Sequence, residues 1–141
     1  MGAATKVVLD TNIYVSALGW NGTERSLYEL CLDGSVDLFI SDFIVNELLR
    51  VLAYPKFNFP LPHRIAFIQD LLRVANTVEV VNIPDLVTDD PDDNHILGCA
   101  EAAGAAYLIT GDSHLLNLAS YGSIIICTAA AFLMHHKRGA I

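Results

Sequence analysis

The chain has 141 residues, which fits one domain, residues 1–141, with a sizeable buried core. Charged residues make up 17% of the sequence, against about 25% in an average soluble protein. Apolar residues make up 53%, so we expect another chain to cover part of the apolar surface. The net charge of −8 argues against a protein that binds nucleic acid through a surplus of Lys and Arg.

No targeting segment is predicted. The longest apolar run, Ile124 to Met134, is interrupted by Thr128 and is shorter than the roughly 20 residues that span a bilayer. The first ten residues lack the apolar stretch of a secretory signal, so a cytoplasmic location is expected. Widely spaced cysteines in apolar sequence predict free, buried thiols at Cys31, Cys99 and Cys127. The five histidines form no HxxxH or HExxH pattern, which argues against a zinc site.

Short runs rich in β-branched residues predict five strands. They lie at 6–10, 37–41, 77–81, 106–110 and 123–127. Most of these runs are continuously apolar rather than alternating, and stretches of helical period separate them. This pattern is typical of a parallel sheet that is covered on both faces.

The predicted helices fill the intervals between the strands. They lie at 13–18, 23–33, 43–54, 62–76, 91–103, 113–119 and 128–137. Glycines near helix ends and the proline-containing stretch 54–62 supply the breaks. Together these elements predict a single α/β domain built as a three-layer sandwich around a doubly wound sheet.

Two acidic residues follow predicted strands directly. Asp10 ends the first strand in "VVLDTN", and Asp112 follows the fourth in "LITGDSHLL". In doubly wound sheets, ligands bind beyond the carboxyl ends of the strands where the strand order reverses. If the first and fourth strands flank that point, these two carboxylates meet across the crevice.

The stretch "VTDDPDDNHIL" at 87–97 holds four aspartates within five positions. Pro91 suits the first helical position, which makes Asp90 the predicted N-cap. Asp93 shares a helical stripe that must face the sheet, with Ile96, Leu97 and Ala100. Asp92 is turned about 100° from Asp93 and is expected at the mouth of the cleft or in solvent. Asp89 receives no role from the pattern.

A fifth acid, Glu47, lies among apolar residues in "SDFIVNELLRVL" at 41–52, where position alone indicates only a surface side chain. Carboxylates that converge raise one another's pKa values unless a cation neutralises them. Oxygen ligands select a hard ion such as Mg²⁺ or Mn²⁺, and such ions promote phosphodiester hydrolysis by activating a bound water. Part of the −8 charge would then belong to a metal site, which weakens the argument against a nucleic-acid substrate.

Four segments, "VVLDTNIYVSAL", "SDFIVNELLRVL", "DPDDNHILGCA" and "AYLITGDSHLLNL", closely resemble the PIN-domain nucleases in content and in order. The nearest group is the PIN proteins that form the toxin component of toxin–antitoxin pairs, and the resemblance covers nearly the whole chain. Each motif alone is weak, but four acidic motifs in this order on an α/β scaffold are specific.

The resemblance implies a metal-dependent ribonuclease with a five-stranded parallel sheet in the order 3-2-1-4-5 and products carrying a 5′-phosphate and a 3′-hydroxyl. It implies one or two Mg²⁺ or Mn²⁺ ions as cofactor, an RNA substrate, an antitoxin partner protein and a homodimer. The family's catalytic and metal-binding acids correspond to Asp10, Glu47, Asp93 and Asp112. Supporting polar positions correspond to Thr11 or Asn12 and to Ser113.

Two other α/β families match the sequence less well. A phosphoacceptor receiver domain would need a Lys after its fifth strand, where this chain has "IIICTA". A haloacid-dehalogenase-like phosphatase would need an acid where Asn12 stands. A PIN domain that only binds RNA or protein, with little or no nuclease activity, stays open. Candidate RNA contacts are the basic residues Arg25, Arg50, Lys56, Arg64 and the segment 135–138.

Overall fold

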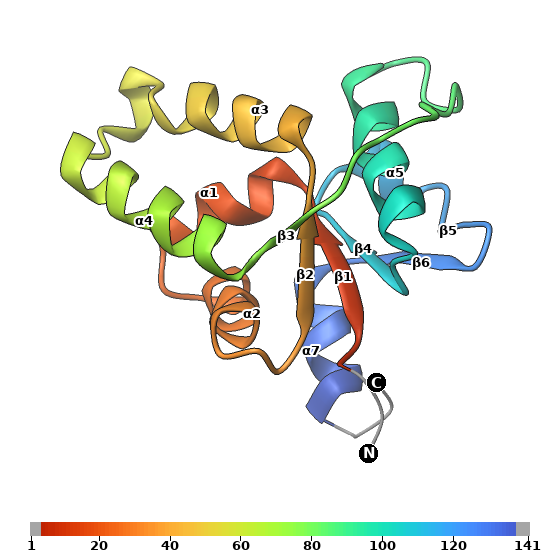
Figure 1. Cartoon of the computed structure of the whole chain (residues 1–141), viewed down its shortest axis with the longest axis horizontal. Helices are drawn as coiled ribbons and strands as arrows, with labels where there is room; N and C mark the ends of the chain where they lie inside the picture. The colour runs from red at the N-terminus through yellow and green to blue at the C-terminus, as the bar shows by residue number, and fades with distance from the viewer. Residues whose placement is uncertain (1–3, 138–141) are drawn as a thin grey trace.

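The computed structural model describes residues 4–137, which build one six-stranded sheet between layers of helices (Figure 1). The strands are β1 (Lys6–Leu9), β2 (Asp37–Ile40), β3 (Asn76–Thr77), β4 (Tyr107–Ile109), β5 (Ser120–Tyr121) and β6 (Ile124–Cys127). Their order is β3-β2-β1-β4-β6-β5. All neighbours pair in parallel except β5 and β6. The five parallel strands confirm the predicted order 3-2-1-4-5.

The sequence pattern did not predict β5. This strand of two residues pairs with β6 across a tight turn in which Gly122 has a φ of 59°. A left-handed glycine at this position lets the chain reverse at once and form a hairpin. The predicted helix 113–119 is shorter for the same reason, because the chain must leave it before β5 begins.

The helices agree with prediction to within a few residues at each end. They are α1 (Thr11–Gly19), α2 (Thr23–Leu32), α3 (Asp42–Leu52), α4 (Leu61–Val74), α5 (Asp92–Ala103), α6 (Ser113–Leu116) and α7 (Ala129–Lys137), with a 3₁₀ turn at Pro55–Phe57. Helix α1 begins two residues earlier than predicted because the Asp10 carboxylate accepts the Thr11 backbone N–H and caps the helix. Ser41 caps α3 in the same way through the N–H of Ile44.

The connections between parallel strands decide which face each helix covers. Helices α1 to α4 follow strands that step outwards from β1 to β3, whereas α5 lies on the return from β3 to β4. With right-handed crossovers throughout, the return connection covers the opposite face of the sheet. Helix α5 contacts β1, β2 and β4 there. The central strand β1 is therefore covered on both faces, and Val7, Val8 and Leu9 are fully buried.

The predicted strand 77–81 is wrong beyond Thr77. The last bond to the sheet joins the Val78 N–H to the Ile40 carbonyl, and residues 78–91 then cross α5 as an irregular segment, here called the strap. Gly98 permits this path, because a Cβ on it would stand 2.9 Å from Val80 Cγ1 and 3.0 Å from the Asn82 carbonyl oxygen. The close approach of the strap to α5 therefore replaces further strand pairing.

Asn94 fastens the strap to α5. Its side-chain Oδ1 accepts the N–H groups of Leu86 and Val87 at 3.0 and 2.9 Å, and its Nδ2 donates to the Val87 carbonyl at 2.9 Å. The Asn94 side chain is buried, so its two bonds to Val87 form away from solvent, while the bond to Leu86 is partly buried.

The predicted free cysteines are confirmed in the described residues: Cys31 and Cys99 are buried, and Cys127 is half-buried. Among residues 4–137, none of the helices is long and apolar enough to cross a bilayer.

Replacing Asn94 by Ala should lower the free energy of unfolding by about 2–4 kcal/mol, because two backbone donors and one acceptor lose their partner. Urea denaturation measures this loss, and hydrogen exchange at Leu86 and Val87 should accelerate. Asn46→Ala, at an exposed position on α3, is the matched control and should change stability by less than about 0.5 kcal/mol. Equal effects of the two substitutions would show that Asn94 does not hold the strap.

Candidate functional site

A cavity of about 170 Å³ opens where the starts of α1, α5 and α6 meet the middle of α3. Figure 1 shows α3 and α5 on either side of the end of the sheet at which β1 and β2 finish. The walls of the cavity carry six carboxylates: Asp10, Glu47, Asp90, Asp92, Asp93 and Asp112. All four acids singled out from the sequence thus line one cavity, although they are separated by up to about a hundred positions in the chain.

Asp10 is held by hydrogen bonds to both of its carboxylate oxygens. Oδ1 accepts the Thr11 N–H at 2.7 Å, and Oδ2 accepts the Thr110 hydroxyl at 2.7 Å. The same Thr110 hydroxyl accepts the Asp112 N–H at 3.0 Å. Because β1 and β4 are adjacent, this one threonine ties the acids at the two strand ends together, as the topology predicted.

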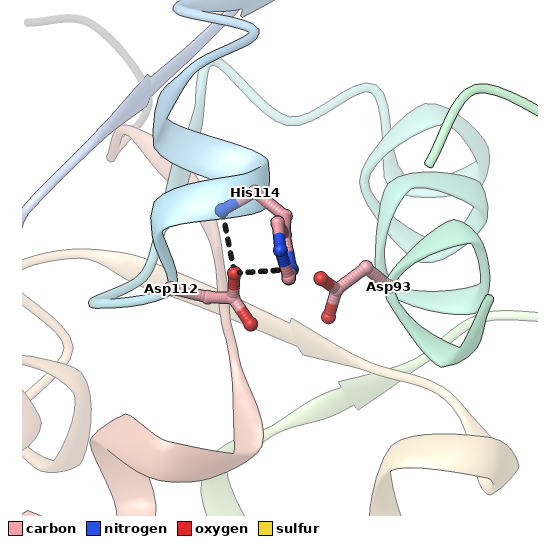
Figure 2. A group of neighbouring side chains, drawn as sticks. All are labelled: Asp93, Asp112 and His114. Carbon is pink, nitrogen blue, oxygen red and sulfur yellow. Dashed lines mark hydrogen bonds and ion pairs between the residues drawn. The ribbon is translucent and has the colours of Figure 1, made fainter. Parts of the chain in front are cut away.

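Asp112 is the N-cap of α6, and its Oδ1 accepts the His114 N–H at 2.7 Å. The His114 ring folds back over this carboxylate, with Nδ1 3.5 Å from Oδ1. Figure 2 shows the His114 ring between Asp112 and Asp93. The Asp93 side chain extends from α5 towards the other two residues. One ligand atom from each of these three residues lies within 4.8 Å of the other two.

Glu47 reaches the cavity from the middle of α3 and accepts a hydrogen bond from the Thr11 hydroxyl. Its Oε2 lies 3.9 Å from the Arg50 guanidinium, which is largely exposed. Of the supporting polar positions, Thr11 and Asn12 line the cavity. Ser113 is exposed and does not line it.

Asp93 has the most perturbed carboxyl group of the cavity. It is only 5% exposed, and its Oδ2 is buried without a hydrogen-bond partner. Burial, together with the nearby carboxylates of Asp112, Asp90 and Asp10, raises the pKa of Asp93 to about 8. A buried acceptor without a donor is costly, and a bound cation would satisfy it.

Burial also raises the pKa of Asp10, to about 6. The hydrogen bonds from Thr110 and Thr11 favour the ionised form and oppose this rise, while the charges of Glu47 and Asp112 add to it. Asp10 therefore ionises more readily than Asp93, because its oxygens already have donors.

The prediction that Asp90 caps α5 is wrong. The helix begins at Asp92, and its N-cap residue, Pro91, makes no side-chain capping bond. The N–H groups of Asp93 and Asn94 bond instead to the backbone carbonyls of Asp90 and Pro91. This turn leaves the Asp90 side chain free, and it lines the cavity. Asp92 is exposed at the cavity rim, as predicted.

Sequence reasoning missed Thr110 and His114. Thr110 comes two residues before Asp112 at the end of a strand, a position from which a hydroxyl reaches the same cavity. His114 comes two residues after Asp112, and its neighbour across the rim is Asp89, whose Oδ2 lies 3.8 Å from Nε2. The position of His114 two residues after an acid at a strand end could have predicted its place in the site. The search for metal-binding spacings between pairs of histidines did not find it, because its neighbours are aspartates.

The donor set fits a hard divalent cation. Carboxylate oxygens from four separate elements converge, and Asp93 Oδ2 has no donor of its own. Such oxygens are the ligands that Mg²⁺ and Mn²⁺ prefer. Asp10, Asp93 and Asp112, with Glu47 beside them, are the residues that would hold an ion in this cavity.

In the absence of metal, the chain should become less stable as the pH rises from about 4 to 8. The folded state raises the pKa of Asp93 to about 8, so it keeps a proton that the unfolded chain releases near the ordinary value of 3.8. The contribution of Asp93 to the free energy of unfolding is fully present below about pH 4 and is lost by about pH 8. The total loss is a few kcal/mol. Thermal unfolding in EDTA between pH 5 and 8.5 measures the loss.

Asp93→Asn should flatten this dependence above about pH 6, leaving only the smaller loss below it that Asp10 causes. Asp85→Asn, which removes an exposed carboxylate from the strap, should keep the whole dependence. Adding Mn²⁺ at pH 8 should raise the melting temperature of the wild-type chain, because the ion binds only the folded state. A parallel pH dependence in wild type and Asp93→Asn would contradict the raised pKa.

Residues 6–114, from β1 into α6, match the family model of the PIN domain. This segment contains all four acids and His114. The uncharacterized protein MJ1680 of Methanocaldococcus jannaschii is 30% identical over 117 residues, which cover 80% of this chain and 74% of the archaeal protein.

Proposed function

Because this chain belongs to the PIN-domain family, a family of metal-dependent nucleases, we propose that it is a metal-dependent ribonuclease that hydrolyses RNA phosphodiester bonds. The observation that carries the proposal is the cavity in which acids from four elements surround the unpartnered Asp93 Oδ2. A protein that used these side chains only for folding would gain nothing by burying a carboxylate without a donor.

The four acids divide into two roles. Asp10, Asp93 and Asp112 would hold one or two Mg²⁺ or Mn²⁺ ions, which when bound supply a Lewis acid that activates water and stabilises the leaving oxygen. Glu47 would complete the ligand set or orient the attacking water, with the Thr11 hydroxyl fixing one of its oxygens. Thr110 positions Asp10 through the hydrogen bond to Oδ2.

Arg50 is the best-supported contact to an RNA phosphate. Its guanidinium is exposed and lies beside the Glu47 carboxylate at the cavity rim. Arg25 and Arg64 instead donate to backbone carbonyls, Arg25 to those of Ala17 and Leu18, and so serve the fold. Arg138, in the terminal basic segment, lies outside the described residues.

The biological role we propose is that of the toxin in a toxin–antitoxin pair, with a cognate antitoxin protein as partner. The support is the resemblance of the four acidic segments to PIN toxins. A small neighbouring gene that encodes a DNA-binding protein would strengthen this role, and its absence would weaken it without affecting the proposed chemistry.

Purified protein should cleave a labelled, largely single-stranded RNA in Mg²⁺ or Mn²⁺ and not in EDTA, leaving 5′-phosphate and 3′-hydroxyl ends. Asp10→Asn and Asp93→Asn should each reduce the rate on the order of 10²-fold or more, because each removes a ligand charge. Asp85→Asn is the control on the strap and should cleave at the wild-type rate. Circular dichroism checks that each variant folds.

Two results would redirect the proposal. A folded chain that binds Mn²⁺ by calorimetry but cleaves no RNA would indicate a PIN domain that acts by binding. A chain that binds no divalent cation would contradict the carboxylate site itself.

We further propose that two copies of the chain associate through α3 and α4. Three exposed apolar side chains of these helices, Leu49, Leu61 and Ile65, line a groove of about 180 Å³, and Leu72 is exposed on α4 as well. Exposed apolar residues gathered in this way are typical of an interface.

Light scattering at micromolar concentration should therefore give the mass of a dimer. Ile65→Glu should shift the chain to a monomer, because it introduces a charge into the apolar contact. Val81→Glu, which changes an 82% exposed side chain on the strap, should leave the dimer intact. A monomeric wild-type chain would exclude this association.

A further inference from the structure

His114 stands next to the acids in a geometry that its short helix fixes. The bond from its N–H to Asp112 Oδ1 turns the ring back over the carboxylate, which brings Nδ1 to 3.5 Å from the same oxygen. The ring lies on the side of Asp112 that faces Asp93 (Figure 2). The imidazole is 41% exposed, so it is partly open to solvent rather than packed in the core.

The spacing of the three side chains suits one shared ion. One ligand atom from each residue lies within 4.8 Å of the other two. This is somewhat wider than the roughly 3–4.2 Å between atoms that bind one ion through bonds of about 2.1 Å, so a small movement of the side chains would bring all three to a shared ion. The buried, unpartnered Asp93 Oδ2 is independent support for a ligand at this point, because no protein group satisfies it.

Asp89 occupies the other side of the ring. Its Oδ2 lies 3.8 Å from Nε2, opposite the nitrogen that faces Asp112. A histidine that binds a metal commonly donates its second N–H to a carboxylate, which fixes the ring orientation. The strap that carries Asp89 is fastened by Asn94 at Leu86 and Val87, which places the Asp89 backbone beside His114 and leaves its side chain 78% exposed.

We propose that His114 is a metal ligand, which with Asp93 and Asp112 makes a mixed nitrogen and oxygen site that prefers Mn²⁺ to Mg²⁺. Mg²⁺ takes oxygen ligands and keeps its waters, whereas an imidazole nitrogen adds affinity for first-row transition ions. Asp89 is a positioning residue that orients the ring. The inference rests on the proposed function, since it concerns the ion that the same acids would hold.

Calorimetric titration of the full chain with MnCl₂ and with MgCl₂ tests the preference. His114→Gln should weaken Mn²⁺ binding about tenfold or more, on the scale of losses caused by removing a metal site's partners, and should change Mg²⁺ binding less than about threefold. Asp89→Asn should cause a smaller loss for Mn²⁺. His63→Gln removes an exposed imidazole on α4 and should leave both affinities unchanged.

Pulsed electron paramagnetic resonance of the Mn²⁺-loaded chain gives a readout that does not depend on activity. The wild-type and His63→Gln chains should show the ¹⁴N coupling of a coordinated imidazole, and His114→Gln should lack it. Mn²⁺ binding without ¹⁴N coupling, or equal weakening for both ions in His114→Gln, would overturn the role of His114 and leave the carboxylate site intact. A wild-type chain that binds neither ion would overturn the proposed function as well.

Discussion

Repulsion between carboxylates is the constraint around which this molecule is organised. Asp10, Asp93 and Asp112 line one small cavity, and burial together with their mutual repulsion raises the pKa of Asp93 to about 8 and that of Asp10 to about 6. Without a cation, this arrangement opposes folding. The apolar sheet and the helices packed on it must therefore supply the stability that holds the acids together, and β1 does so with side chains that are fully buried.

The acids of the cavity do not have equal numbers of hydrogen-bond donors. Both oxygens of Asp10 accept protein donors, and Oδ1 of Asp112 accepts the His114 N–H, whereas Asp93 Oδ2 has no partner. Asp93, whose Oδ2 has no donor, has a higher pKa than Asp10, whose two oxygens both have donors, and it has the greater need for a cation. In this way the protein leaves one acid available to an incoming ion while its neighbours are already positioned.

The strap connects the edge of the sheet to this centre. It leaves β3 after Thr77, crosses α5 at Gly98 and is fastened by Asn94, the residue that follows Asp93. Asp90 then lines the cavity, and Asp89 lies beside His114. A segment that would otherwise have extended an edge strand instead brings two more carboxylates to the rim, so local packing on α5 and the composition of the site are coupled.

The sequence by itself determined where the helices and most of the parallel strands lie and that Asp10 and Asp112 stand at strand ends, because continuous apolar runs and strand-end acids are local patterns. The strand order that brings these two acids together, and the choice of Glu47, came only from the resemblance to the PIN-domain nucleases. Asp93 shares a helical stripe with apolar residues, and this local pattern likewise predicted that its side chain faces inward. Only the tertiary structure decided that Thr110 binds Asp10 across a hundred positions, that Asp90 does not cap α5, and that His114 joins the acids. Those outcomes depend on distances between side chains from separate elements, which no local periodicity encodes.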